Sequence, residues 1–266
     1  MKIGIFGLGV VGNSVKLAFE AAQIDVVSYD PKFDLQYDGT KFLTCQFIFV
    51  CVPTPTTDGK QDQTAIYDVC RKLTALKYHG AVVIKSTVLP ETCDKLTQTF
   101  PLLFIHNPEF LTERNARQDF LKQTDILYSI PKGYSAIQQE FETIHRKALP
   151  ASSALKFHDF NDYKITEMAK YLHNCFLATK VVFANEMYRL CKTNDTDFSK
   201  VVKAAQTQGK IGESHWQVPG HDGKFGYGLS CFPKDMEALS YYSVQKHCVQ
   251  MVLTSALITN KQIRQD

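Results

Sequence analysis

The feature that most limits the possible folds is a glycine-rich turn near the start of the chain. A short apolar run, Lys2 to Phe6, leads directly into the motif G-x-G-x-x-G, made of Gly7, Leu8, Gly9, Val10, Val11 and Gly12. In such a turn the first glycine allows a tight bend, the second lets the backbone approach a pyrophosphate, and the third lets helix and strand pack closely. We therefore predict a strand, this turn and a helix over Val10 to Ala22, with a dinucleotide bound by Gly7, Gly9, Val10, Val11 and Gly12.

An acidic residue stands where this interpretation needs one. A second apolar run, Asp25 to Tyr29, predicts a strand that ends at Asp30. A carboxylate in this place accepts hydrogen bonds from both ribose hydroxyls and repels a 2′-phosphate, which favours NAD as the cofactor. The alternative is a glycine turn that binds no cofactor.

The first half of the chain alternates strand and helix patterns. Two continuous β-rich runs, Phe47 to Val52 and Ala81 to Lys85, are typical of parallel strands that are buried on both faces. The other expected elements are the strands Leu102 to Ile105 and Ile126 to Ile130 and the helices 64–76, 90–99 and 134–147. This order predicts an α/β fold with a Rossmann-type doubly wound parallel sheet over residues 1–158.

After residue 158 the strand patterns stop and helical patterns follow. One long helix is expected over Asp162 to Lys192, with apolar residues on nearly all sides, which predicts that it is largely buried. A shorter helix over Asp197 to Gln206, a glycine-rich loop over 208–228 and a helix from Pro233 onward complete a helical domain, residues 159–266.

The composition excludes several classes of protein. Hydrophobic residues make up 44% and charged residues 21% of the chain, which excludes intrinsic disorder. The basic residues behind the net charge of +3 are scattered, and the longest apolar run is too short to span a bilayer, so neither nucleic acid nor a membrane is an expected partner. The first residues show no secretory signal, which predicts a soluble cytoplasmic protein. The eight cysteines include no C-x-x-C pair; we expect them to be reduced and packed, except for Cys231, and we expect no metal site.

Four further segments carry polar residues in an unusual combination. They are Lys85 to Thr92 (KSTVLPET), Asn107 to Leu111 (NPEFL), Glu167 to Asn174 (EMAKYLHN) and Gly226 to Asp235 (GYGLSCFPKD). In this order and spacing, and together with the glycine-rich turn, they resemble the UDP-glucose/GDP-mannose 6-dehydrogenase family over essentially the whole chain. The resemblance implies NAD-dependent oxidation of the C6 alcohol of a nucleotide sugar in two hydride transfers, foremost of UDP-glucose to UDP-glucuronate.

Cys231 has the chemistry that such an oxidation needs. A cysteine thiolate can hold the intermediate aldehyde as a thiohemiacetal, whose oxidation gives a thioester that water cleaves. Cys231 follows a glycine-rich loop and comes shortly before Pro233, a residue typical of a first helical turn. The amino end of that helix and the neighbouring Lys234 favour the thiolate. The alternative is a loop cysteine that only packs.

The resemblance also implies roles for other residues. Lys170 and Asn174, which share one face of a helix, stabilise the developing oxyanion. Asp235 and Thr87 hold or activate a water near C6, and Glu109 is linked to thioester hydrolysis. The remaining assignments are Lys234 to the cofactor and Phe110, Leu111, Lys210 and Gly228 to the substrate.

Three acidic or hydroxyl side chains in the four segments also have an interpretation that involves no active site. Asp235 could complement a helix dipole, and Thr87 could cap the turn after a strand. Glu167 could be an ordinary acid on an exposed helix face.

The chain departs from the family pattern in several ways. Leu229 and Arg114 stand where the family usually has glycine, and Lys210 stands in place of an arginine and loses its bidentate fork. Family members are longer, because they carry a third, Rossmann-like domain that binds the nucleotide. The resemblance therefore predicts that this domain is absent, in a fragment or in a natural minimal form.

A homodimer is expected, because the resemblance places the long helix at a two-fold interface. Three alternatives for the function stay open. They are GDP-mannose as the substrate, an NAD-binding module with little activity alone, and a one-step hydroxyacid dehydrogenase in which Cys231 has no role.

Overall fold

The computed structural model describes residues 1–33, 36–149, 155–248 and 250–264. The chain divides into two compact units. The first, called the sheet unit here, comprises residues 1–55 and 62–170, and the second, called the helical unit, comprises residues 56–61 and 171–266.

Parallel strands form the main sheet of the sheet unit, in the order β2-β1-β3-β6-β7. Their bounds are Lys2–Phe6 for β1, Asp25–Tyr29 for β2, Phe47–Val50 for β3, Ala81–Ile84 for β6 and Leu103–His106 for β7. Every residue of β3 and β6 is buried, because these strands are covered on both faces.

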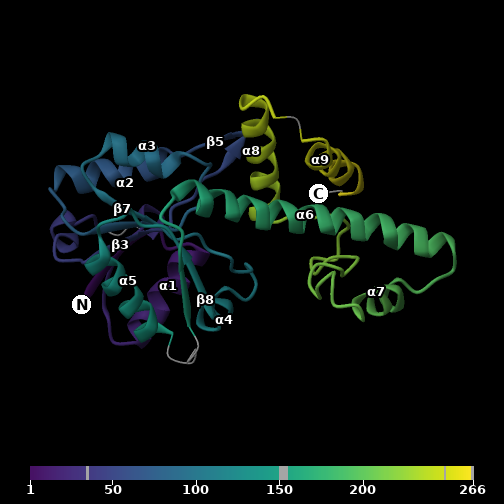
Figure 1. Cartoon of the computed structure of the whole chain (residues 1–266), viewed down its shortest axis with the longest axis horizontal. Coiled ribbons are helices and arrows are strands. Elements are labelled where there is room, and N and C mark those ends of the chain that lie inside the picture. The colour runs from purple at the N-terminus through teal and green to yellow at the C-terminus, as the bar shows by residue number, and fades with distance from the viewer. Residues whose placement is uncertain (34–35, 150–154, 249, 265–266) are drawn as a thin grey trace. The chain divides into compact units, whose positions relative to one another are not determined.

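Helices cover both faces of this sheet (Figure 1). They are α1 (Val10–Ala21), α2 (Thr64–Ala75), α3 (Thr92–Thr99), α4 (Ala116–Leu121) and α5 (Ser135–Ala148). Along β3, Phe47 and Phe49 join the apolar cluster that packs against α1 and α5, whereas Ile48 and Val50 join the cluster against α2 and α3. The predicted Rossmann-type doubly wound α/β sheet is confirmed.

One expected strand does not extend the parallel sheet. β8 (Asp125–Tyr128) pairs in parallel with β9 (Lys156–Asp159), and an antiparallel bridge between His106 and Ser129 links this pair to β7. The sequence did not predict β9, because its residues K-F-H-D are mostly polar and none of them is buried.

The helical unit contains the hairpin of β4 (Thr56–Thr57) and β5 (Lys60–Gln61), and α7 (Phe198–Gln206), α8 (Cys231–Gln245) and α9 (Met251–Ile263). The prediction of helical structure from Pro233 onward is confirmed, and this structure consists of the two helices α8 and α9. Helix α8 ends where His247 takes a φ of +55°, and the N–H groups of Lys246, His247 and Cys248 bond back to carbonyls of its last turn.

Helix α6 (Tyr163–Thr193) starts in the sheet unit and continues in the helical unit after Lys170. Its first turn is tied to the sheet, because Tyr163 Oη donates to the Phe104 carbonyl at 2.7 Å and Thr166 Oγ1 lies 2.7 Å from His106 Nδ1. The expectation that this helix is largely buried is wrong for the single chain. The exposed residues in its helical-unit part include Leu172, Phe176, Phe183 and Leu190.

The cysteines differ in exposure. Cys231 and Cys248 are exposed, so Cys248 does not follow the expectation of a packed thiol. Within the described residues, no helix has both the length and the apolar character that a membrane crossing requires.

Candidate active site

Each glycine of the glycine-rich turn has a different surrounding. Gly7 takes a φ of +90°, and a Cβ there would lie 2.6 Å from the Cys51 carbonyl oxygen. A Cβ on Gly12 would lie 1.8 Å from the Gly7 carbonyl oxygen. A Cβ on Gly9, in contrast, would meet no heavy atom within 4 Å. The fold therefore requires glycine at 7 and 12, whereas the space beside Gly9 is open to a ligand.

This open space suits a pyrophosphate. Gly9 is the N-cap residue of α1, so the N–H groups of Val10 and Val11 have no acceptor within the helix. The first turn of α1 carries no acidic side chain that would repel an anion. The residues present thus fit a dinucleotide whose phosphates lie at the helix amino end.

Asp30 is held beside the turn by backbone contacts. Its Oδ2 accepts the Leu8 N–H at 2.6 Å and its Oδ1 accepts the Lys32 N–H at 2.9 Å. The residue is 7% exposed, so its carboxylate has one defined orientation. Each carboxylate oxygen keeps a second lone pair, which allows it to accept from ribose hydroxyls as well.

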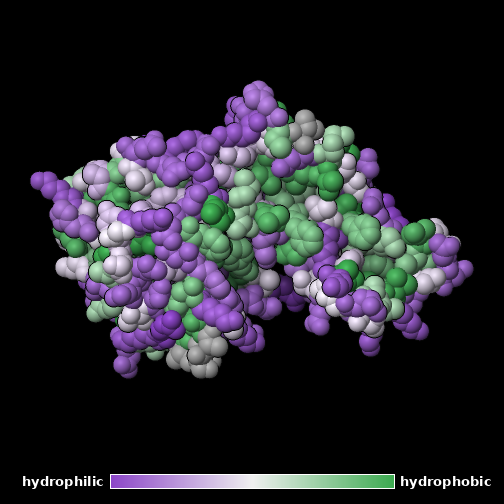
Figure 2. Space-filling view, viewed as in Figure 1, coloured by the Kyte–Doolittle hydropathy of each residue, from purple (hydrophilic) through white to green (hydrophobic). Residues whose placement is uncertain are grey.

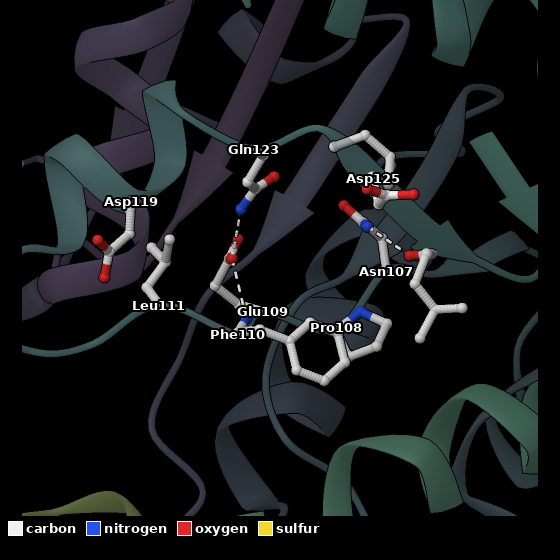
Figure 3. A pocket seen from close by; sticks show the side chains of 10 residues that line it. Asn107, Pro108, Glu109, Phe110, Leu111, Asp119, Gln123 and Asp125 are labelled. Carbon is white, nitrogen blue, oxygen red and sulfur yellow. Dashed lines mark hydrogen bonds between the residues drawn. The ribbon is translucent and has the colours of Figure 1, made fainter. Parts of the chain in front are cut away.

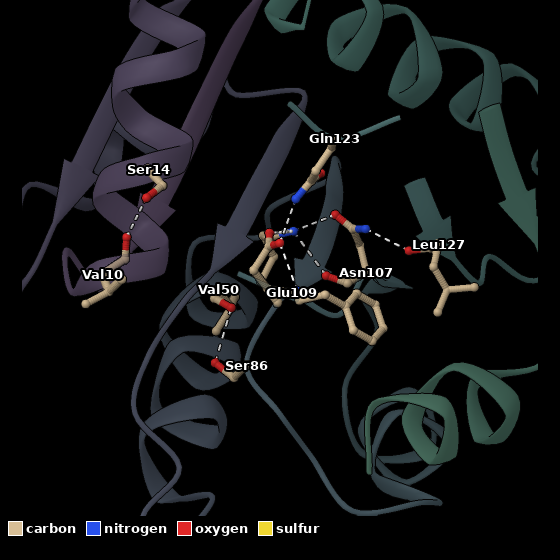
Figure 4. Close-up of polar contacts among 10 residues, drawn as sticks. Val10, Ser14, Val50, Ser86, Asn107, Glu109, Gln123 and Leu127 are labelled. Atoms are coloured by element: carbon tan, nitrogen blue, oxygen red, sulfur yellow. Dashed lines mark hydrogen bonds and ion pairs between the residues drawn. The ribbon is translucent and has the colours of Figure 1, made fainter. Parts of the chain in front are cut away.

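A buried ion pair lies at the carboxyl end of the sheet. Lys85 directly follows β6, and its Nζ lies 2.9 Å from Glu109 Oε2, with the two side chains only 3% and 5% exposed. The same ammonium donates to the carbonyl and to Oδ1 of Asn107, at 3.2 and 2.9 Å. Glu109 Oε1 accepts from Gln123 Nε2 at 2.7 Å and from the Phe110 N–H at 3.0 Å (Figure 4). Both carboxylate oxygens of Glu109 therefore have protein partners.

A small cavity of about 90 Å³ opens beside this ion pair. Figure 3 shows that the side chains of Glu109 and Gln123 point toward one another, and Asn107, Phe110 and Leu111 are among the other residues that line the cavity. The cavity places the predicted substrate residues Phe110 and Leu111 next to Glu109.

Lys170 lies in the same unit, on α6. Its side chain is almost buried, and its ammonium lies 5.1 Å from the centre of the Phe110 ring. A cation over an aromatic face is attracted by the ring electrons, so this contact holds the ammonium in place. The structure thus brings Lys170 into contact with Phe110, and the sequence predicted both as site residues.

Glu167 is a buried acid that anchors the segment after Thr87. Its two carboxylate oxygens accept the N–H groups of Glu91 and Cys93 at 2.8 Å, at the amino end of α3. The residue is 0% exposed, so the alternative of an exposed helix-surface acid is wrong. Burial raises the pKa of Glu167 to about 7, although these hydrogen bonds act in the opposite direction. The Thr87 carbonyl is held separately by Thr54 Oγ1 at 2.8 Å.

In the helical unit, Asn174 and Asp235 are paired. Asn174 Nδ2 donates to Asp235 Oδ2 at 2.6 Å, and Lys234 Nζ donates to the other oxygen, Asp235 Oδ1. Asp235 is fully buried and Asn174 nearly so. His173 Nδ1 lies 3.0 Å from Asn174 Oδ1, which fixes the orientation of the amide.

Cys231 is the first residue of α8 and is exposed. Pro233 lies within the first turn of this helix, as predicted from its residue type. Because the amino end of a helix attracts negative charge, the position suits a reactive thiol. Lys210 lies in the exposed loop that follows α7, and Gly228 lies three residues before Cys231.

Two profiles of one protein family match the chain. Residues 32–147 match the NAD binding domain of the UDP-glucose/GDP-mannose dehydrogenase family, and residues 164–262 match its central domain. The chain belongs to this family. The sheet unit therefore carries an NAD-binding domain, which confirms NAD as the predicted cofactor.

Curated relatives and solved structures agree with this membership. The UDP-glucose 6-dehydrogenase of Rickettsia conorii is 32% identical to this chain over an alignment that covers 81% of it. That of Rhizobium meliloti is 31% identical over 82% of the chain. These alignments cover 49% and 50% of the relatives, so the chain spans about half the length of the curated relatives it matches.

The fold agreement extends over almost the whole chain. The GDP-mannose dehydrogenase of Pseudomonas aeruginosa has a TM-score of 0.70 and 26% identity, over 99% of this chain and 69% of its own. A UDP-glucose dehydrogenase of Pyrobaculum islandicum has a TM-score of 0.83 over 98% of this chain and 68% of its own, and at 24% identity it shows a shared fold.

The departure from the family pattern at residue 229 has a structural cost. Leu229 takes a φ of +63°, in the left-handed region that favours glycine, and its side chain is 65% exposed. Leucine adopts this backbone conformation less readily than glycine, so Leu229 lowers the stability of the fold at this position. Arg114 is exposed in a loop before α4.

Sequence reasoning missed the role of Lys85. The sequence pattern marks Lys85 only as the first residue of the KSTVLPET segment and as the end of a strand, and it predicts no partner for it. The sequence signal for this ion pair is the position of Lys85 at the end of a fully apolar run. Such a run predicts a buried strand, and a lysine buried at its end requires a counter-charge.

Proposed function

We propose that this chain carries out the NAD-dependent oxidation of the C6 primary alcohol of UDP-glucose to the carboxylate of UDP-glucuronate. The observation that supports it best is an exposed thiol, Cys231, at the first residue of α8. It lies in the same unit as the buried Asn174–Asp235 pair, in a chain of the UDP-glucose/GDP-mannose dehydrogenase family.

The proposed reaction has four steps. The alcohol loses a hydride from C6 and a proton from its oxygen to give the aldehyde. The Cys231 thiolate then adds to C6, forming a C–S bond, and the carbonyl electrons move to oxygen, which takes a proton. The thiohemiacetal loses a second hydride and a proton to give a thioester, and water then breaks the C–S bond to release the carboxylate, the thiol and a proton. When bound, NAD supplies the acceptor for each hydride.

The charged and amide groups stabilise the oxygen that becomes negative. We assign this role to the ammonium of Lys170 and the amide of Asn174, whose positions are fixed by Phe110 and Asp235. A preorganised donor of this kind is worth about 3 kcal/mol of transition-state stabilisation.

Asp235 and Thr87 are proposed to hold the water that attacks the thioester. For Glu109 we propose a positioning role in thioester hydrolysis, since both of its oxygens have partners within the protein. Lys234 is proposed to contact the cofactor as well as Asp235. Phe110, Leu111, Lys210 and Gly228 are proposed to contact the sugar nucleotide.

The test is the ratio of NADH formed to nucleotide sugar consumed, measured with the full chain on UDP-glucose and on GDP-mannose. We expect two NADH per UDP-glucose for the wild type, and no turnover to the acid when Cys231→Ser is used. Cys248→Ser is the matched control, because Cys248 is the other exposed cysteine among the described residues and is expected to be dispensable.

Other outcomes separate the alternatives. Two NADH per GDP-mannose, with none from UDP-glucose, would change the substrate. One NADH per substrate, with full activity in Cys231→Ser, would contradict the thioester mechanism. NAD binding without turnover on either sugar nucleotide would support a binding module.

We also propose that the chain forms a homodimer through α6. In its helical-unit part, Leu172, Phe176, Phe183 and Leu190 are between 51% and 68% exposed and lie four or seven residues apart. This spacing places them on one stripe of the helix. Figure 2 shows hydrophobic side chains at the surface of the helical unit. Sedimentation at micromolar concentration should show a dimer that Phe176→Lys converts to a monomer; a monomeric wild type would refute it.

A further inference from the structure

The loop before Cys231 is held by side chains of α9. Asn260 Oδ1 accepts the Tyr227 N–H at 2.8 Å, and Asn260 Nδ2 donates to the Tyr227 carbonyl at 3.0 Å. One amide thus satisfies both backbone groups of one loop residue. Asn260 is 8% exposed, so water does not readily replace these bonds. The contact fixes both the backbone of Tyr227 and the orientation of the amide.

A second amide holds the preceding residue. Asn185 on α6 accepts the Gly226 N–H at 3.1 Å, and its own Nδ2 donates to the Val181 carbonyl at 2.8 Å. Asn185 is 2% exposed. Side chains of α6 and α9 therefore hold two consecutive residues of the loop by hydrogen bonds.

The glycines of this loop leave space for two side chains, Asn260 of α9 and Arg264, the residue that follows α9. Gly226 takes a φ of +71°, and a Cβ there would lie 2.4 Å from Asn260 Oδ1. A Cβ on Gly228 would lie 2.2 Å from Arg264 Nη2 and 2.7 Å from its Nη1. Gly228 is not among the residues with positive φ, so the fold does not need glycine there for its backbone conformation. The nearest obstacle to a side chain at 228 is the Arg264 guanidinium.

Arg264 is itself fixed in place. Its Nη2 lies 2.8 Å from Asp222 Oδ2, and its side chain is only 9% exposed. Asp222 Oδ1 in turn accepts the Lys224 N–H at 3.1 Å. The guanidinium therefore connects two points of the loop, at Asp222 and at Gly228.

The held segment is in direct contact with the start of α8. The Tyr227 ring is buried and packs edge-on against Phe232, with ring centres 6.3 Å apart. Phe232 follows Cys231 in the first turn of α8. A shift of Tyr227 would therefore move the residue next to the thiol.

We propose that Asn260 and Arg264 are positioning residues for Cys231, which they orient by fixing the backbone from Asp222 to Gly228. This inference rests on the proposed function in one respect, namely that Cys231 is the nucleophile. Neither side chain touches the thiol; both act through the loop, which Tyr227 and Phe232 connect to the first turn of α8.

The first test measures thiol reactivity and does not need turnover. The full chain is treated with iodoacetamide, and alkylation of each cysteine is followed by peptide mass spectrometry. Cys248 is the internal reference, because it is exposed and lies outside the held loop. We expect Asn260→Asp, which keeps the acceptor for the Tyr227 N–H but loses the donor to its carbonyl, to change the Cys231 to Cys248 rate ratio.

Global unfolding is distinguished within the same experiment. Cys175 and Cys191 are buried in the helical unit and become alkylated when that unit opens. Gln262→Ala is the matched control, since it changes an exposed residue of the same turn of α9. An unchanged ratio in Asn260→Asp, with Cys175 and Cys191 protected, would overturn the role of Asn260.

A double-mutant cycle tests Arg264 separately. A side chain at 228 must displace the guanidinium, so Gly228→Ala and Arg264→Ala should change the Cys231 ratio in the same direction. In the double variant the second change should add little to the first, because both remove the same contact. Additive effects would overturn the role of Arg264, even if Asn260→Asp fails to fold.

Turnover supplies the remaining readout. Asn260→Asp should lower kcat for acid formation by about tenfold or more, since a displacement of about 1 Å at a reacting group can cost about a hundredfold. The affinity for NAD should change less than kcat, because the glycine-rich turn and Asp30, which are predicted to bind it, belong to the sheet unit. If the wild-type chain oxidises no nucleotide sugar, the proposed function fails, while the alkylation ratios still test the positioning role.

Discussion

The ammonium of Lys85 lies 2.9 Å from the carboxylate of Glu109, with both side chains almost fully buried. A buried pair of this kind contributes little net stability, but removal of one partner leaves an uncompensated charge.

We therefore expect Lys85→Met to lower the free energy of unfolding by about 3–5 kcal/mol, because Glu109 stays charged in a buried place. The double variant Lys85→Met/Glu109→Gln should recover part of this loss. Urea denaturation of the single and double variants measures both effects. Lys16→Met is the control, because it removes the partially exposed Lys16–Glu20 pair and should cost less than about 1 kcal/mol. Equal losses in the Lys85 and Lys16 variants would contradict the prediction.

The glycine-rich turn predicts different effects for two neighbouring glycines. Gly12→Ala should destabilise the sheet unit, because its Cβ would meet the Gly7 carbonyl at 1.8 Å. Gly9→Ala should leave the stability nearly unchanged, because its Cβ meets no protein atom within 4 Å. NADH affinity should nevertheless fall in Gly9→Ala, since the methyl group enters the space proposed for the pyrophosphate. Thermal denaturation and fluorescence titration with NADH measure the two properties, and unchanged affinity in Gly9→Ala would place the phosphates elsewhere.

Leu229 has a backbone conformation that glycine adopts more readily. A non-glycine residue in the left-handed region costs about 1–2 kcal/mol, and glycine gives back part of this through its greater freedom in the unfolded chain. We expect Leu229→Gly to stabilise the protein by about 0.5–1 kcal/mol in chemical denaturation. Leu43→Gly is the control, because Leu43 is also exposed but has a φ of −61°, so glycine should destabilise there. A loss of stability in Leu229→Gly would show that its side chain makes contacts worth more than the strain.

The buried Glu167 is expected to lower the free energy of unfolding as the pH rises. Its pKa is about 7 in the folded protein against 4.5 in its ordinary state, so between these values the folded chain binds a proton that the unfolded chain has lost. Its contribution therefore falls by about 1.4 kcal/mol per pH unit from pH 4.5 to 7. The decline should be absent in Glu167→Gln, so the difference in unfolding free energy between wild type and variant should shrink as the pH rises from 4.5 to 7. Urea denaturation at several pH values measures it, and parallel curves would mean that Glu167 is ionised throughout.

The buried His145 is expected to lower the free energy of unfolding as the pH falls, which is the opposite pH dependence to that of Glu167. Burial lowers its pKa to about 3 from 6.5, so below pH 6.5 the unfolded chain binds a proton that the folded chain does not. The wild type should lose about 1.4 kcal/mol per pH unit from this residue as the pH falls from 6.5 towards 3. His145→Gln should show a shallower decline than the exposed-site control His79→Gln. Identical slopes in the two variants would contradict the prediction.

Much of the fold follows from patterns within short stretches of sequence. The strands β1, β3 and β6 and the turn between β1 and α1 could be predicted because backbone dihedrals and burial on both faces restrict which residues fit. Strand β9 could not, since its residues are mostly polar and its pairing with β8 depends on contacts between distant segments, including His158 with Asp125.

The same division holds at the candidate site. The places of Asp30 after a strand, of Lys170 on the long helix and of Cys231 beside a helix start could be predicted from the sequence, and the chemistry proposed for them rests on their residue types. Their neighbours depended on contacts between distant segments: Lys85 with Glu109, Glu167 with the N–H groups of α3, and Asn260 with Tyr227. A local pattern restricts only neighbouring dihedrals and the burial of one face. The partner of a buried charge or amide is set by which segments meet when the chain packs, and by the cost of leaving such a group unpaired.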